Sequence, residues 1–436
     1  MDAKWEALEQ TVWQASAQVY ALEVTTVRLD STTTYGYHQV TDTGVMQHGH
    51  SKDHRPDLPQ LKLMAALAES AGQWVASEVY PGQRADDGLY VPLYQRVHKI
   101  LEQAGLLYIG DCKMAALGTR AQIAAGGDYY LTRLPRNLFS GTQWEAWEAR
   151  RTTAEHLTLF WEAGALVGAG CEWEETRSAE VAGETVTWQE RLQWVYAPTL
   201  AAQQQQALER RLQQATAALQ ALTPAPGRGK RALRDAATLQ ARSTAILDQH
   251  QVSGLLRPRW EVVEQRQTRY VGRGRGSAER PTREIIRQHY RITTVERVPP
   301  AIAAVQSALG WQLQVTNAPA VRLPLAQATA AYRAEWHLEH DFHRLKDRPV
   351  GLSPLFVWRD DQLCGLTRLL TLALRLLTLI ATQVAQGLAA DERSLPGLYE
   401  GQPQRATTHP TAVRLLRALS RAEITLTKIQ SPTHTE

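Results

Sequence analysis

The stretch VTTVRLDST, residues 24–32, places Asp30 directly after a run rich in apolar and β-branched side chains. A second run, LLYIGDCKM at residues 106–114, ends in the same way at Asp111. Both runs predict short, largely buried strands. Ligands bind at the carboxyl ends of parallel strands, so we expect both carboxylates to face a crevice. For Asp111 the alternative is a cap for the helix predicted at 115–127.

A third acidic residue lies in YRAEWHLEHDFHRLK, residues 332–346, whose pattern predicts one helix. Tyr332, Glu339 and Lys346 recur at seven-residue steps, which keeps their side chains on one helical stripe. The Glu339 carboxylate is therefore expected between a phenol and an ammonium. The alternative is an ordinary amphipathic helix, with its aromatic side chains packed inward and its charges solvated.

In this order, the three acids and the two residues flanking Glu339 resemble the DDE transposases of bacterial insertion sequences. The resemblance is to the group whose last catalytic helix carries a tyrosine, arginine, glutamate and lysine signature. Two residues separate Tyr332 from Glu335, three more precede Glu339, and six lie between Glu339 and Lys346. The chain departs from the pattern at Glu335, which replaces the signature arginine, so strand positioning is expected to be weaker.

Other segments resemble stretches of the same enzymes, and together they cover most of the chain outside its middle part. They are GHSKDHRPDLPQ at 49–60, SEVYPGQRADDGLYVPL at 77–93 and the run at 360–379. Only one amphipathic helix precedes Asp30, whereas such enzymes commonly carry an end-recognition domain there. An N-terminally truncated copy is therefore one interpretation of the chain.

The resemblance implies an α/β fold, a ribonuclease-H-like mixed sheet flanked by helices. A large α+β insertion would interrupt it between the second aspartate and the glutamate. Three blocks are expected. They are 1–137, the first part of the catalytic core; 138–310, the insertion with a helical hairpin and strands; and 311–436, the second part of the core with C-terminal helices.

The resemblance also implies Mg²⁺-dependent cleavage and strand transfer at insertion-sequence ends. Asp30, Asp111 and Glu339 would be the catalytic residues and the ligands of two Mg²⁺ ions, which Mn²⁺ could replace. Carboxylate oxygens suit Mg²⁺, and a pair of ions can stabilise both the attacking and the leaving oxygen. Tyr332 and Lys346 would bind DNA phosphate. The expected partner is double-stranded DNA, both transposon ends and target, with a homodimer formed on the DNA.

Two other classes of protein stay open. A metal-dependent nuclease of the same fold would hydrolyse DNA without joining it. An inactive, DNA-binding remnant of a transposase would bind DNA equally well with or without Mg²⁺.

Composition agrees with these classes and argues against others. The 436 residues are 44% hydrophobic, which allows two or three domains with buried cores. The net charge is only +4, so binding to nucleic acid would depend on local patches. The three cysteines form no C-x-x-C pair, which fits a reducing cytoplasm, and the resemblance implies association with the nucleoid there. The Leu-rich segment 363–385 is interrupted by Arg368 and Arg375, so we expect a packed helix and no membrane span.

Local patterns predict the order of elements. In the first block we expect strands at 23–30, 74–80 and 106–110, another strand after Gly127, and helices at 58–70, 88–104 and 115–125. In the middle block, leucine spacing predicts a helical hairpin, with a dimerising coiled coil as the alternative. Basic segments at 228–234 and 269–280 are either phosphate-following loops or ordinary solvated loops. For His48, His50 and His54 we favour a hydrogen-bonded loop over a metal site.

Overall fold

The computed structural model describes residues 2–153, 157–224, 233–271, 281–334 and 336–420. These residues form two compact units, which are described separately. Unit 1 comprises residues 1–158, 171–194 and 313–436, and unit 2 comprises residues 159–170 and 195–312. The three-block division at residues 137 and 310 stays a prediction.

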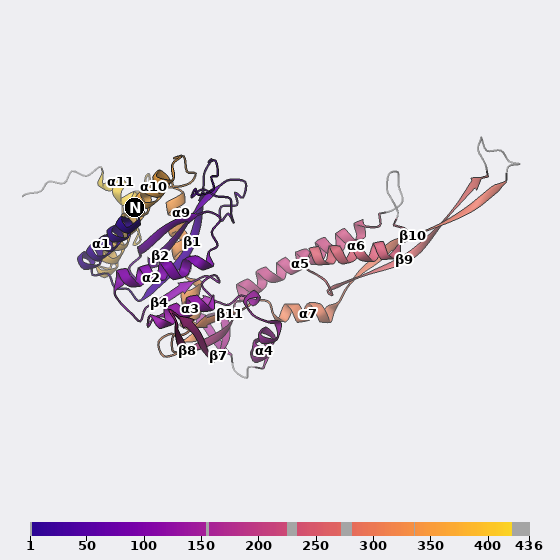
Figure 1. Cartoon of the computed structure of the whole chain (residues 1–436), viewed down its shortest axis with the longest axis horizontal. Coiled ribbons are helices and arrows are strands. Elements are labelled where there is room, and N and C mark those ends of the chain that lie inside the picture. The colour runs from indigo at the N-terminus through magenta and orange to yellow at the C-terminus, as the bar shows by residue number, and fades with distance from the viewer. Residues whose placement is uncertain (1, 154–156, 225–232, 272–280, 335, 421–436) are drawn as a thin grey trace, which may run out of the picture. The chain divides into compact units, whose positions relative to one another are not determined.

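A large mixed sheet organises unit 1, and helices flank it (Figure 1). The strand order is β3-β2-β1-β4-β5-β11-β8-β7-β6; β7 and β8 continue along the chain into unit 2, and β6 belongs to unit 2 except for its first residue. Strands β1, β2 and β3 pair antiparallel, whereas β4 is parallel to both β1 and β5. This α/β arrangement is compatible with a ribonuclease-H-like fold. The strand bounds are β1 Thr26–Tyr35, β2 Gln60–Ala68, β3 Gln73–Pro81, β4 Leu107–Gly110, β5 Tyr129–Arg133, β6 Thr158–Glu162, β7 Ala165–Val181, β8 Glu184–Tyr196 and β11 Trp311–Thr316.

The helices of unit 1 lie before, between and after these strands. Their bounds are α1 Asp2–Tyr20, α2 Tyr90–Leu101, α3 Leu117–Ala125, α4 Gly141–Thr152, α8 Leu325–Arg333, α9 Trp336–Lys346, α10 Asp360–Ala390 and α11 Ala412–Leu419. Short 3₁₀ turns, η1 Asp87–Leu89 and η2 Arg136–Leu138, precede α2 and α4. The expected strands at 74–80, 106–110 and after Gly127, and the helices near 88–104 and 115–125, are confirmed within a few residues.

The helix expected at 58–70 is wrong, because residues 60–68 form strand β2. The run QLKLMAALA is rich in leucine and alanine, which favour helices in isolation. Every one of its residues is buried, and the strand pairs with β1 on one side and β3 on the other. Tertiary pairing therefore overrides the local helical preference.

Two further boundaries differ from the sequence prediction. Strand β1 continues through the hydroxyl-rich residues to Tyr35, so Asp30 lies in the middle of the strand rather than at its end. The single helix expected at 332–346 is divided, since α8 ends at Arg333 and α9 begins at Trp336. Tyr332 therefore does not share a helix with Glu339 and Lys346.

The core of unit 1 is formed where α9 and α10 pack on β2. Leu61, Leu63, Ala65 and Leu67 lie two residues apart along β2 and thus on one face of the sheet. They pack in one cluster with Leu338, Phe342 and Leu345 of α9 and with Leu363 and Leu374 of α10. Helix α9 therefore covers the face of β1 and β2 from which these alternate side chains project.

Unit 2 contains the predicted helical hairpin. Its elements are α5 Pro198–Ala221, α6 Ala236–Gln249, β9 Leu256–Tyr270, β10 Thr282–Arg297 and α7 Pro299–Ser307. The seam residues Leu208, Leu212 and Leu219 of α5 are buried. They pack against Leu239 of α6, against Ile292 of β10, and against Val252 and Leu255 between α6 and β9. The seam is therefore covered within this chain, as the intramolecular interpretation predicts.

Helix α10 has 31 residues and is long and apolar enough to cross a membrane by length and composition. One such helix is weak evidence for a span, because core helices have the same composition. In this protein α10 contacts β3, α9 and α11. Its Arg375 is 5% exposed and forms an ion pair inside the fold.

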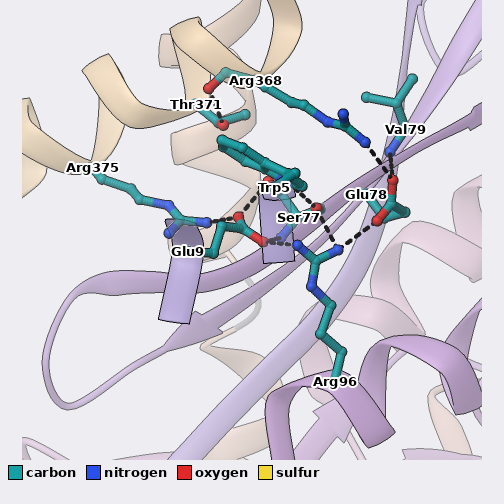
Figure 2. Close-up of polar contacts among 9 residues, drawn as sticks. All are labelled: Trp5, Glu9, Ser77, Glu78, Val79, Arg96, Arg368, Thr371 and Arg375. Carbon is teal, nitrogen blue, oxygen red and sulfur yellow. Dashed lines mark hydrogen bonds and ion pairs between the residues drawn. The ribbon is translucent and has the colours of Figure 1, made fainter. Parts of the chain in front are cut away.

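Buried charges join α1, α2 and α10 to strand β3 (Figure 2). The Glu9 carboxylate is fully buried and pairs with both Arg96 of α2 and Arg375 of α10. It also accepts hydrogen bonds from the Ser77 Oγ at 3.0 Å and the Ser77 N–H at 3.3 Å. Burial raises the pKa of Glu9, and the two arginines partly oppose that rise. The Glu9 carboxylate is thus a common counterion of two largely buried guanidinium groups, and Glu78 of β3 is a second counterion of Arg96.

Replacing Glu9 with alanine is expected to lower the free energy of unfolding by about 3–5 kcal/mol, because it leaves two buried arginines without their common partner. The measurement is the apparent melting temperature by circular dichroism. Glu6→Ala is the matched control, since Glu6 is exposed on the same helix. Equal melting temperatures for the two variants would contradict the assigned role of Glu9.

Candidate metal and catalytic site

The register of β1 with β4 brings the two aspartates together. These strands are parallel, and Arg28–Ile109 and Leu29–Gly110 are consecutive pairs. The next residue on each chain is Asp30 and Asp111, respectively. Residues in register on parallel strands project from the same face of a sheet. Both carboxylates therefore leave the sheet side by side.

Asp30 and Asp111 line one small cavity, named here the acid cavity. Its lining also includes Arg28, Ile109, Tyr332 and Leu338. Asp30 lies opposite Ala65 of β2, and Ala65 belongs to the core cluster that contains Leu338 and Phe342 of α9. The acid cavity therefore opens on the face of the sheet that α9 covers.

Arg28 fixes the end of α8 beside the acid cavity. Its guanidinium pairs with Glu69 at 3.0 Å and donates a hydrogen bond to the carbonyl of Ala331 at 2.5 Å. A cation is favourable at the C-terminal end of a helix, where carbonyl groups lack helical partners. This contact places Tyr332, the next residue, at the cavity.

Ionisation of the Asp30 carboxyl group is energetically unfavourable in this cavity. Its side chain is 17% exposed, and its Oδ1 accepts hydrogen bonds from the Ser31 N–H at 2.6 Å and Lys52 Nζ at 3.2 Å. Burial raises the pKa of Asp30 to about 6, the Lys52 ammonium opposes that rise, and the nearby Asp111 carboxylate adds to it. Asp30 and Asp111 thus share one cavity, and the Lys52 ammonium is the counterion of Asp30.

The Asp111 carboxylate is held by donors from two elements. Its Oδ1 accepts hydrogen bonds from Tyr90 Oη at 2.6 Å and from the Lys113 N–H at 2.8 Å. Burial, then the charges of Asp111 and Asp30, raise the pKa of Tyr90 well above its usual value, so the phenol remains a donor. The alternative role of Asp111 as a helix cap is wrong, because Ala116 occupies the N-cap of α3.

Glu339 does not join the two aspartates. It lies in the first turn of α9 and its side chain is exposed. Within the part of the chain that the structure describes, no three His, Cys, Asp or Glu side chains are grouped to hold a metal ion. The preceding residue, Leu338, does line the acid cavity, so the backbone that carries Glu339 passes its rim. Glu335 lies outside the described residues.

Lys346 belongs to a neighbouring contact rather than to the lining of the acid cavity. Its Nζ lies 2.6 Å from Asp53 Oδ1, and both side chains are largely buried. Asp53 accepts a further, long hydrogen bond from Thr33 Oγ1 of β1 at 3.5 Å. Asp53 directly follows Lys52, the counterion of Asp30. The same loop therefore contacts both Asp30 and Lys346.

No sequence pattern marks Lys52, Tyr90 or Asp86 as site residues. Asp86 forms an ion pair with the buried Lys62 and accepts a hydrogen bond from Ser31 Oγ at 3.1 Å. Burial alone would raise the pKa of Asp86, but Lys62 lowers it overall. Lys52 lies in the segment 49–60, Asp86 and Tyr90 lie in the segment 77–93, and Ser31 follows Asp30. The family resemblance of these segments as a whole was therefore the sequence signal that pointed to this part of the site.

The histidine-rich loop and the basic segments were the other candidate sites in the sequence. His48, His50 and His54 belong to no group of three or more His, Cys, Asp or Glu side chains in the described residues, and the choice between a loop and a metal site stays a prediction. Most of the basic segments at 228–234 and 269–280 lies outside the described residues.

Comparison with known proteins leaves the family of this chain open. No protein-family model matches it, and no curated protein matches it. Among solved structures, the chain is similar to a piggyBac transposase in a synaptic complex with hairpin DNA, with 9% identity and a TM-score of 0.23. The match covers 84% of this chain and 56% of that chain, so this chain spans little more than half of that protein. This likeness is too distant to assign fold or function.

The raised pKa of Asp30 predicts a pH-dependent stability. The ionised carboxylate destabilises the folded protein above about pH 6, and the penalty disappears as the pH falls towards 3.8. A pKa raised from 3.8 to about 6 corresponds to at most about 3 kcal/mol. Asp30→Asn should therefore raise the melting temperature at pH 8 in EDTA, and its advantage over the unmodified protein should shrink near pH 4.

The matched control is Asp42→Asn, which neutralises an exposed aspartate. Its melting temperature should follow that of the unmodified protein across the pH range. An Asp30→Asn variant that is less stable at pH 8 would contradict the electrostatic penalty assigned to Asp30.

Proposed function

We propose that this protein is a transposase that cleaves DNA strands and transfers their ends with the aid of divalent metal ions. The proposal assigns it to DDE transposases of bacterial insertion sequences. The observation that carries it is the pair of carboxylates from adjacent parallel strands in one cavity, where burial and mutual repulsion raise the pKa of Asp30. A divalent cation would relieve both costs.

The residues of the acid cavity fit a hard cation in part. Mg²⁺ is commonly held by one or two carboxylates together with water and substrate phosphate. Asp30 and Asp111 supply two carboxylates, and Lys52 supplies positive charge beside Asp30. Glu339 is the third ligand in the proposal, and α9 would have to bring its side chain inward from the exposed position.

Each residue has a defined role in the proposal. Asp30, Asp111 and Glu339 would hold two Mg²⁺ ions, or Mn²⁺ in their place, and such a pair would supply charge stabilisation to the attacking and leaving oxygens of phosphodiester transfer. The Tyr90 hydroxyl orients Asp111 through their 2.6 Å hydrogen bond. Tyr332, at the cavity, and Lys346, beside the loop of Lys52, bind phosphates of the DNA.

The wider setting belongs to the same proposal. The mixed sheet and its flanking helices would be a ribonuclease-H-like core, with residues 138–310 as its insertion. Double-stranded DNA, both transposon ends and target, would be bound by a homodimer in the cytoplasm, at the nucleoid.

Asp30→Asn and Asp111→Asn are expected to lower Mg²⁺-dependent DNA cleavage on the order of 10³-fold, because loss of a metal ligand removes several kcal/mol of charge stabilisation. Calorimetric titration with Mn²⁺ should show weaker binding in both variants. Asp42→Asn, far less buried, should retain cleavage and Mn²⁺ binding. Cleavage that survives both cavity variants would refute the catalytic proposal.

The products separate the proposed activity from its alternatives. A labelled DNA end with a free 3′-hydroxyl should be joined to target DNA, and joined strands are visible on a denaturing gel. Cleavage without joining would identify a metal-dependent nuclease. DNA binding that is indifferent to Mg²⁺, with neither reaction, would identify an inactive remnant.

Glu339→Gln tests the third ligand. We expect cleavage to fall about as far as in Asp30→Asn, since the variant keeps the shape of the side chain but removes its charge. Asp347→Asn, at an exposed acid just beyond α9, is the control. If Glu339→Gln and Asp347→Asn cleave equally well, Glu339 is not a ligand, and the two aspartates act without it.

A further inference from the structure

A basic pocket lies between the end of α10 and helix α11, in a part of the chain that the proposed function does not use. Leu395 and Thr407 pair through two backbone hydrogen bonds of 2.9 and 3.1 Å, which close the intervening loop. Within that loop the Gln402 N–H donates to the Tyr399 carbonyl at 3.0 Å. The loop is therefore ordered by its own backbone, and it forms one wall of a cavity of about 310 Å³.

Three arginines converge on this cavity, named here the arginine pocket. Arg405 comes from the loop, and Arg414 and Arg417 lie one turn apart on α11. Glu400 is the one carboxylate in its described lining. None of the three guanidinium groups forms an ion pair with any residue in the described ranges, so the pocket holds an excess of positive charge.

Tyr399 orders two of these guanidinium groups. The guanidinium carbons of Arg405 and Arg414 lie 4.0 and 4.4 Å from the centre of its ring. Stacking on an aromatic ring holds a guanidinium in place while its edge N–H groups remain free to donate. Arg405 uses one of its donors for Gln402 Oε1 at 3.2 Å. The remaining donors are available to an anion.

We propose that the arginine pocket binds a phosphate group of the DNA backbone. Guanidinium forks match phosphate oxygens in bidentate geometry, and three of them in one pocket, two of them stacked on the Tyr399 ring, suit a phosphate better than a single carboxylate. All three arginines are exposed, so a long polyanion can lie across the pocket without entering it. The choice of DNA as the polyanion rests on the proposed function, but the binding itself needs no metal.

The test is the affinity of the full chain for a fluorescein-labelled DNA duplex, measured by anisotropy in EDTA. For the double variant Arg414→Gln/Arg417→Gln we expect about tenfold weaker binding at about 0.1 M NaCl. The slope of log K against log salt concentration should become shallower by about 1 to 2, because each lost phosphate contact releases one counterion fewer. Arg393→Gln removes an exposed arginine outside the pocket and should change neither quantity.

A second measurement separates DNA phosphate from free phosphate. If inorganic phosphate raises the melting temperature of the unmodified protein but the double variant binds DNA normally, the pocket is a free-anion site and the proposal is overturned. Unchanged DNA affinity and salt slope without any phosphate effect would overturn it as well. Far-ultraviolet circular dichroism, expected to be unaltered, verifies that the double variant is folded.

The two proposals can fail independently. The binding measurement is made in EDTA, where no divalent ion is available, so it does not depend on the proposed metal ligands. Loss of cleavage with intact DNA binding concerns the acid cavity alone. Normal DNA affinity in Arg414→Gln/Arg417→Gln would reject the arginine pocket while leaving the catalytic proposal untouched.

Discussion

The parallel pairing of β1 with β4 is the constraint on which the rest of the candidate site depends. Because Leu29 lies opposite Gly110, Asp30 and Asp111 leave the sheet at the same level and on the same face. A shift of one residue would turn one carboxylate to the opposite face. The two negative charges would then no longer repel each other, and Asp30 would lose part of the cause of its raised pKa.

The groups around these two carboxylates compensate their negative charge only in part. Lys52 reaches Asp30 from a loop, and Tyr90 and a backbone N–H donate to Asp111. Arg28 turns to Glu69 and to the end of α8 instead of pairing with the aspartates. A carboxylate pair that is only partly neutralised attracts a cation. The arginine pocket elsewhere in unit 1 likewise attracts an anion.

The sequence predicted the parts of the site that depend on local pattern. Apolar runs located β1 and β4, and the aspartates that follow those runs do meet. Local pattern was less informative where long-range pairing decides the structure. The residues of β2 prefer a helix locally, and only their pairing with β1 and β3 makes them a strand. The break between α8 and α9 was missed for a similar reason, since the seven-residue spacing of Tyr332, Glu339 and Lys346 suits a continuous helix. Lys52 and Tyr90 carry no pattern of their own, because their contacts join residues 21 or 22 positions apart.

The ion pair between Glu9 and Arg375 joins residues 366 positions apart in the chain. During translation, Glu9 leaves the ribosome long before its partner on α10 is synthesised. Arg96 and Ser77 are made early enough to pair with Glu9, but the part of β3 that contacts α10 stays uncovered until almost the whole polypeptide has emerged. The first half of unit 1 is thus a natural client for chaperones that hold nascent chains.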